Sequence, residues 1–112
     1  MPDVIDERLF ADARPLPPGG EVHSRRLDVR GAQHVNITVG ISTAGGDANV
    51  ECTIFFGRTD EFFPMRTDAF SQTNFLSTSV PVFGPQLMVE VKNNGNQATN
   101  CDGTVYAVRE VP

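Results

Sequence analysis

VPVFGPQLMVEVKNNGNQATNCDGTVYA, residues 80–107, is the stretch that decides the fold class. Leu87, Val89 and Val91 alternate with residues that point the other way, which is the period of a strand with one buried face. Residues 93–96 then supply asparagine and glycine, which tolerate the positive φ needed where a chain reverses. We therefore predict a β-hairpin, in which a strand, a polar turn and a returning strand follow one another.

Outward from this hairpin, the same strand character recurs along the chain. Four further segments are predicted strands, namely residues 21–29, 34–41, 50–56 and 104–111. The first should be irregular near Ser24, and turns are expected at residues 30–33 and, as a hairpin loop, at 43–49. In the last segment either Val105 and Ala107 or Tyr106 and Val108 face the core, and the alternation does not decide between the two pairs.

The 8 prolines and 10 glycines fall mostly between these segments, as many turns require. About six to eight strands with turn residues between them are typical of an antiparallel sandwich. The predicted fold is all-β, a single antiparallel β-sandwich of jelly-roll-like form with a short N-terminal arm. A length of 112 residues suits one domain. We assign residues 1–20 to the arm and a Pro/Gly-rich linker, and residues 21–112 to the β-sandwich domain.

The arm admits two structures and two positions. Ile5 and Leu9 are four residues apart, as on one face of a helix, but residues 9–11 suit a short edge strand equally well. Residues 14–20 are too rich in proline for a helix or a central strand. An apolar arm on such a tether either packs on a neighbouring subunit or packs on its own domain.

Residues 57–79 form a long connection without clear periodicity, which is unusual inside a compact domain. The segment is rich in phenylalanine, and Pro64 prevents a continuous helix. Its apolar side chains either cap the sandwich, with a short strand at residues 74–78, or form a contact surface for another subunit. The interface candidates from this segment and the arm are Ile5, Leu9, Phe10, Phe62, Phe63, Met65 and Phe70.

Composition excludes several classes of function. A formal net charge of −5 argues against nucleic acid as a partner, because backbone binding needs a cationic surface. The first ten residues lack the features of a secretory signal, and no apolar run approaches the ~20 residues of a membrane span. We therefore expect no membrane partner and a cytoplasmic or virion location.

No catalytic or cofactor-binding residues stand out. The two histidines, His23 and His34, have no metal-ligand spacing with each other or with the cysteines, and no nucleotide-binding or nucleophile motif is present. Cys52 and Cys101 are either two buried thiols or one bridge between strands. The acidic residues of the 57–79 segment, Asp60, Glu61 and Asp68, match no EF-hand spacing and give only a weak calcium pattern.

The run VPVFGPQLMVEVKNNG followed by GTVYAVRE resembles the closing hairpin of small bacterial or phage jelly-roll modules of no assigned activity. It covers about a quarter of the chain, and the resemblance implies the sandwich fold but brings no catalytic residue with it. We expect no cofactor and no metal site.

From these features we predict a non-enzymatic structural protein that forms homo-oligomers, with a trimer preferred to a dimer, or that decorates a larger particle such as a phage virion, as a capsid decoration or tail component. Its partners would be itself and other structural proteins of that particle. One alternative is a carbohydrate-binding module, although the chain has no tryptophan and one tyrosine, so Tyr106 or Phe63 would have to stack on the sugar. A small metal-dependent enzyme of cupin type would need more histidines than the two present.

Overall fold

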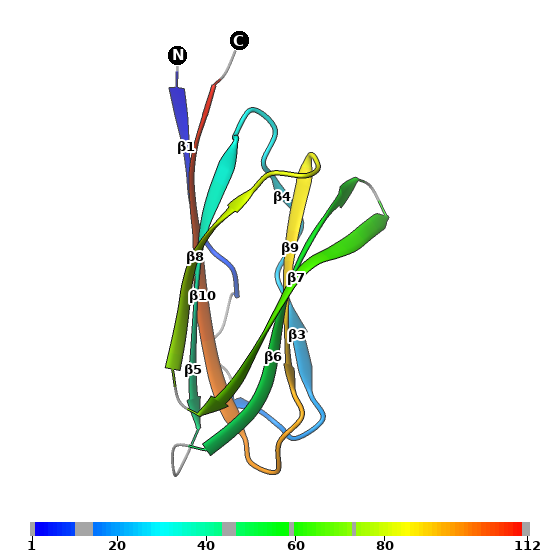
Figure 1. Ribbon diagram of the computed structural model, residues 1–112, viewed down its shortest axis with the longest axis vertical. Coiled ribbons are helices and arrows are strands. Elements are labelled where there is room, and N and C mark those ends of the chain that lie inside the picture. The colour runs from blue at the N-terminus through cyan, green and yellow to red at the C-terminus, as the bar shows by residue number, and fades with distance from the viewer. Residues whose placement is uncertain (1, 11–14, 44–46, 59, 73, 111–112) are drawn as a thin grey trace.

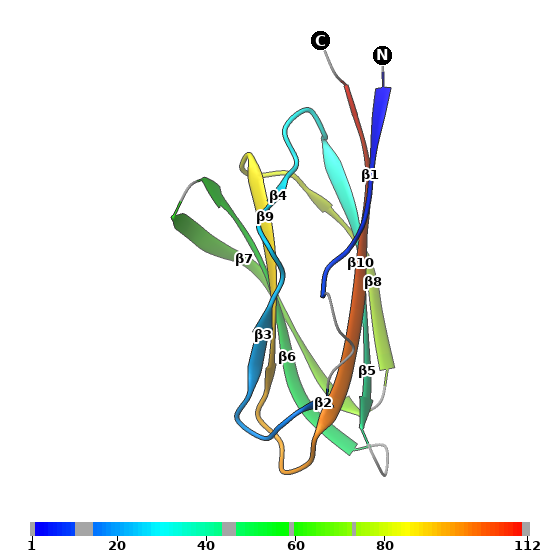
Figure 2. The ribbon, with the colours of Figure 1, turned by 180° about the vertical axis from the view of Figure 1, so that it is seen from behind.

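The computed structural model describes residues 2–10, 15–43, 47–58, 60–72 and 74–110, and in these ranges the chain forms strands and no helix. The two views in Figures 1 and 2 show two layers of strands along the long axis of the molecule. The strands are β1 (Pro2–Arg8), β2 (Pro15–Leu16), β3 (Glu21–His23), β4 (Leu27–Asp28), β5 (His34–Thr43), β6 (Asp47–Arg58), β7 (Glu61–Gln72), β8 (Asn74–Pro81), β9 (Gln86–Asn93) and β10 (Thr99–Glu110).

The strands form two antiparallel sheets, which confirms the all-β sandwich. The first sheet has the order β1-β10-β5-β8, with β2 also pairing with β10. The second has the order β3-β9-β6-β7, with β4 also pairing with β9. From β5 to β10 the chain therefore changes sheet at every connection except β6–β7. Such repeated crossing between two open sheets is the jelly-roll arrangement.

Residues 80–107 are not a hairpin, and this prediction is wrong. Val80 and Pro81 end β8, whereas β9 and β10 belong to different sheets, so the polar turn after Asn93 carries the chain from one layer to the other. The predicted hairpin loop at residues 43–49 is likewise wrong as a hairpin, because β5 and β6 lie in different sheets; residues 44–46 lie outside the described residues. Alternation shows that a strand has one buried face, but it does not identify the strand's partner.

The inward rows of the predicted strands are buried as expected. Between the sheets lie Val35, Ile37, Val39 and Ile41 of β5, Val50, Cys52, Ile54 and Phe56 of β6, and Leu87, Val89 and Val91 of β9. In β10, Val105 and Ala107 are buried while Tyr106 and Val108 are exposed, which settles the alternative that the sequence left open. Burial of each such aliphatic side chain stabilises the folded state by roughly 1.5–3 kcal/mol.

The N-terminal arm is an edge strand of the first sheet. β1 pairs with β10 along its whole length, from Pro2↔Glu110 to Arg8↔Thr104, so these residues are not helical. The strand ends at Arg8, before the residues 9–11 that were expected to form it, and residue 11 lies outside the described residues. Beyond it the Leu9 N–H donates to the Gly103 carbonyl oxygen at 2.8 Å, and the side chains of Leu9 and Phe10 turn into the core. The arm thus packs on its own chain.

The 57–79 segment is not an irregular connection, and this prediction is wrong. β7 pairs with β6 in a long hairpin, and the short strand expected at residues 74–78 is part of β8. Pro64 is tolerated because β7 is an edge strand and because the pairing shifts register at this point, from Ile54↔Arg66 to Phe55↔Pro64. This bulge also interrupts the alternation, which is why the sequence pattern concealed the strand.

The irregularity expected near Ser24 is confirmed. The Ser24 N–H donates to the Val89 carbonyl oxygen at 2.8 Å, and the Ser24 hydroxyl oxygen accepts the Val89 N–H at 2.9 Å. The side chain of Ser24 therefore takes the place of a backbone partner between β3 and β4. The turn expected at residues 30–33 is also present, with Gly31 at a φ of 89°.

Asn93 is fully buried and stabilises the end of the sandwich at which β9 connects to β10. Its Nδ2 donates to the carbonyl oxygens of Leu16 at 2.9 Å and Gln97 at 2.8 Å, and its Oδ1 accepts the Gly95 N–H at 2.9 Å. One amide therefore joins the segment before β3 to the turn between β9 and β10.

Candidate interaction surface

An apolar cleft lies at the end of the sandwich where β6 turns into β7. This is the end from which the two chain termini project in Figure 1, and the β8–β9 connection lies there too. The cleft has a volume of about 430 Å³ and is lined by Phe56, Gly57, Arg58, Glu61, Phe63, Met65, Phe83, Gly84 and Pro85. We call these residues the end cleft.

Two glycines bring the walls of the end cleft together. A Cβ on Gly57 would lie 1.8 Å from the Glu61 carbonyl oxygen, and a Cβ on Gly84 would lie 3.0 Å from the Gly57 nitrogen. Because Gly57 has no side chain, β7 can approach β6 closely at the end of the hairpin, and because Gly84 has none, the β8–β9 connection can pass directly over β6. This passage sets Phe83 edge-to-face against Phe56, with ring centroids 5.9 Å apart and ring planes at 78°.

The end cleft exposes three large apolar side chains. Phe63 is 62% exposed, Phe83 59% and Met65 43%, whereas Phe56 beneath them is buried. Phe63 is the cross-strand partner of Phe56, so it continues the inward row of the second sheet at the end of the β6–β7 hairpin. Contiguous exposed apolar side chains on a folded chain mark sites of interaction with another molecule.

The opposite side of the hairpin tip is held by an arginine. The Arg26 guanidinium lies 5.5 Å from the centre of the Phe62 ring, and Arg26 Nη2 is 3.0 Å from Asp60 Oδ1. A cation over an aromatic face together with an ion pair fixes the tip relative to the segment between β3 and β4. The hairpin that carries Phe63 and Met65 is thereby supported from the side away from the cleft.

The structure brings only some of the predicted interface residues together. Phe63 and Met65 line the end cleft, whereas Phe62 contacts Arg26 and Phe70 is buried near the other end of β7. Ile5, Leu9 and Phe10 are buried in the chain's own core. They offer no exposed contact surface in the folded single chain.

Phe83 is the cleft residue that the sequence reasoning missed. It lies in the stretch 80–84, which looked like the beginning of a strand, but β8 ends at Pro81 and β9 begins at Gln86. The neighbouring Gly84-Pro85 pair is the sequence feature that marks a connection rather than a strand. That Phe83 meets Phe56 follows only from the three-dimensional path of the chain.

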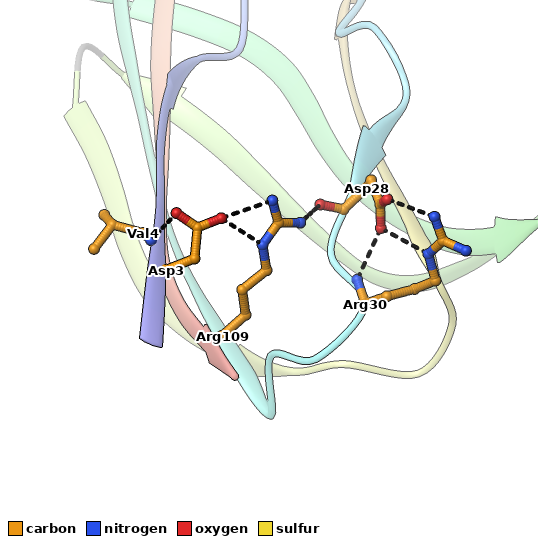
Figure 3. Close-up of polar contacts among 5 residues, drawn as sticks. All are labelled: Asp3, Val4, Asp28, Arg30 and Arg109. Atoms are coloured by element: carbon orange, nitrogen blue, oxygen red, sulfur yellow. Dashed lines mark hydrogen bonds and ion pairs between the residues drawn. The ribbon is translucent and has the colours of Figure 1, made fainter. Parts of the chain in front are cut away.

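A polar network fixes the β1–β10 edge near the same end (Figure 3). Arg109 donates to Asp3 Oδ2 from Nε at 3.1 Å and from Nη2 at 3.0 Å, and to the Asp28 carbonyl oxygen from Nη1 at 3.2 Å. The pKa of Asp3 is lowered chiefly by its hydrogen bonds from Arg109, and that of Asp28 to about 2 chiefly by hydrogen bonds from Arg30. Because Arg109 of β10 binds both the Asp3 carboxylate of β1 and the Asp28 backbone carbonyl of β4, the network ties the first sheet to the second.

The groups considered for chemistry do not converge. Cys52 and Cys101 are free, buried thiols. Burial, and secondly the charge of Asp68, raises the pKa of Cys52 to about 12, and burial raises that of Cys101, so neither forms a thiolate readily. His23 and His34 lie on β3 and β5, in different sheets.

The acidic residues of the weak calcium pattern are separated as well. Asp60 is paired with Arg26, Asp68 is paired with Arg66 at 2.8 Å, and Glu61 lines the end cleft. The aromatic residues proposed for sugar stacking also lie on different sheets, Tyr106 on β10 and Phe63 on β7.

Comparisons with known proteins identify the fold and no family. No family model and no curated protein matches the sequence. The Bacillus endospore appendages, described as disulfide-linked pili, superpose with a TM-score of 0.62 at 9% identity over 100% of this chain and 88% of theirs. The PBSX exported protein XepA gives a TM-score of 0.70 at 12% identity over 96% of this chain and 38% of its own.

A chain of infectious bursal disease virus, Gx strain, gives a TM-score of 0.56 at 12% identity over 96% of this chain and 32% of the viral chain. At such low identities the likeness establishes the all-β sandwich alone. The chain thus resembles, in fold, β-rich proteins of pili and part of a longer viral chain. Within the described ranges no helix is long and apolar enough to cross a membrane.

Proposed function

We propose that the chain is a non-enzymatic structural subunit that associates with copies of itself, or with the other proteins of a larger particle, through the end cleft. The observation that carries the proposal is the group of exposed apolar side chains Phe63, Met65 and Phe83. They lie on the β6–β7 hairpin and the β8–β9 connection, and the ring of Phe83 packs against the buried Phe56. The fold-level likeness to proteins of pili and of a virus supports an assembly role. A trimer is the preferred homo-oligomer. The preferred setting is a phage virion, in which the chain would be a capsid decoration or a tail component.

The energetics suit a protein partner. Burying a phenylalanine or methionine side chain contributes roughly 1.5–3 kcal/mol, so the three exposed residues together form a small interface core. Arg58 and Glu61 on the rim carry opposite charges, which can orient a partner without being buried.

The test is a pair of substitutions on the cleft wall. Phe63→Ser combined with Met65→Ser removes apolar surface that is already exposed, so the variant should keep its circular dichroism spectrum and its unfolding midpoint. Its native mass by light scattering should fall to that of the monomer at concentrations where the unmodified chain is an oligomer.

Val108→Ser is the matched control, because Val108 is also exposed and apolar but lies on the outer face of the first sheet. It should leave the native mass unchanged. Dissociation by Val108→Ser and not by the cleft variant would place the contact on the outer face of the first sheet and refute the role of the end cleft.

A further inference from the structure

We propose that Glu21 and His23 of β3 together with Glu90 of β9 bind a divalent transition-metal ion such as Zn²⁺. No other group of three such side chains converges among the described residues, and their ligand atoms all lie within 4.8 Å of one another. The proposal concerns the solvent face of the second sheet and is independent of the end cleft.

The geometry matches the size of a zinc coordination shell. His23 Nε2 lies 3.1 Å from Glu90 Oε2 and 3.7 Å from Glu21 Oε1. Zinc bonds to nitrogen and carboxylate oxygen of ~2.0–2.2 Å at tetrahedral angles place neighbouring ligand atoms ~3.3–3.5 Å apart. The same ring nitrogen faces both carboxylates, so an ion placed between them meets all three ligands with sub-ångström adjustments at two of the three ligand pairs.

The fold determines this arrangement through its strand register. Glu21 and His23 are two residues apart on β3 and so share a face, and His23 is the direct cross-strand partner of Glu90. The two hydrogen bonds between Ser24 and Val89 lie immediately next to the His23–Glu90 pair and fix its register. The ligands are therefore positioned by backbone pairing.

The surroundings permit entry and set the local charge. The side chains of Glu21, His23 and Glu90 are 52%, 43% and 22% exposed, so an ion can reach them from solvent and water can complete the shell. Lys92 is the cross-strand partner of Glu21, and on the other side Glu51 and Thr53 of β6 pair with Lys92 and Glu90. Glu51 offsets the charge of Lys92, which leaves the group with a net negative field that favours a cation.

The ligand set also predicts selectivity. An imidazole nitrogen favours zinc, cobalt, nickel and copper, whereas magnesium and calcium prefer all-oxygen sites. The buried thiols of Cys52 and Cys101 do not compete in the folded chain.

Isothermal titration calorimetry with Zn²⁺, on the full chain at neutral pH, tests the proposal, with Mg²⁺ as a comparison ion. We expect one Zn²⁺ per chain, and at least about tenfold weaker binding in His23→Gln and in Glu90→Gln, since loss of a group that merely supports a ligand already costs about 10–100-fold. A Zn²⁺-dependent rise of the unfolding midpoint should disappear in the same two variants.

The chain provides two matched controls. His34→Gln removes the other histidine, and Glu51→Gln removes one negative charge close by without removing a ligand. His34→Gln should bind Zn²⁺ as the unmodified chain does, and Glu51→Gln, which weakens only the surrounding field, should weaken binding far less than the loss of a ligand does. Absence of Zn²⁺ binding at millimolar concentration, binding that survives in His23→Gln, or an equal loss in Glu51→Gln would each overturn the proposal.

Discussion

Gly103 is the position at which the placement of the N-terminal arm can be tested most sharply. It lies on the inward face of β10, and a Cβ there would lie 3.0 Å from Leu9 Cδ1, 3.1 Å from the Thr38 carbonyl oxygen and 3.2 Å from Phe10 Cε2. All three distances are shorter than comfortable carbon contacts of ~3.5–4.0 Å. Gly103→Ala should therefore force the arm outward or strain the β5–β10 pairing.

The magnitude follows from two opposing effects. Overpacking of a well-filled core costs ~1–3 kcal/mol. Replacing glycine by alanine also restricts the unfolded chain, which stabilises the fold by ~0.4–1 kcal/mol where the backbone allows it. We expect Gly103→Ala to lower the free energy of unfolding by about 0.5–2 kcal/mol, and Gly103→Val to lower it further because the added methyl groups enlarge the clash.

Urea unfolding followed by circular dichroism measures this change, and Gly40→Ala is its control. Gly40 lies on the adjacent β5, where an added Cβ would have no atom within 4 Å. The control should be neutral or stabilising by up to ~1 kcal/mol. If Gly103→Ala behaves like Gly40→Ala, Leu9 and Phe10 do not occupy the space above Gly103.

A double-mutant cycle identifies the contact. Leu9→Val removes the δ carbons that face Gly103, at a cost of about 1 kcal/mol by itself. If the clash is with Leu9, Gly103→Ala should lower the free energy of unfolding by a smaller amount in the Leu9→Val background than in the unmodified chain. The difference should be at least ~0.5 kcal/mol. Simple additivity of the two changes would refute the reasoning.

Three further predictions concern single side chains. Asn93→Ala should lower the free energy of unfolding by about 2–3 kcal/mol, measured by urea unfolding, because it removes three hydrogen bonds at a buried site, including the one to Leu16. Cys52, with its pKa raised to about 12, keeps its proton in the folded chain, while the unfolded thiol loses its proton above pH ~9. The free energy of unfolding should therefore fall from pH 9 towards 12, by up to ~1.4 kcal/mol per pH unit. Cys52→Ala should flatten that slope. Arg66 donates to the Thr78 hydroxyl at 2.6 Å and so links β7 to β8, and Arg66→Ala should speed amide hydrogen exchange in both strands while costing only ~1 kcal/mol or less, because the side chain is partly exposed.

The sequence predicted the strands better than their partners. The inward rows of β5, β6 and β9 were readable because each strand has one buried face, and that pattern is local. The pairing of β9 with β6 rather than β10 depends on where distant segments meet, and no local pattern records it. β7 was missed because its edge position and its bulge at Pro64 remove the alternation that marks a strand.

The two candidate sites show the same limit. Phe63 and Met65 were found from composition alone, since large apolar side chains beside a proline in a polar segment are conspicuous. Phe83 and Glu90 were not found, because Phe83 joins the end cleft through the path of the β8–β9 connection and Glu90 meets His23 through strand register. Both depend on contacts between residues far apart in the sequence.

Self-association through the end cleft is the property on which the proposed function depends. Sedimentation equilibrium of the unmodified chain over a wide concentration range measures it. We predict a mass that is a multiple of 12.2 kDa, with three-fold the preferred value, and a return to 12.2 kDa when Phe63 and Met65 are both replaced by serine. A mass of 12.2 kDa at every concentration, or an oligomer that the cleft variant leaves intact, would contradict it.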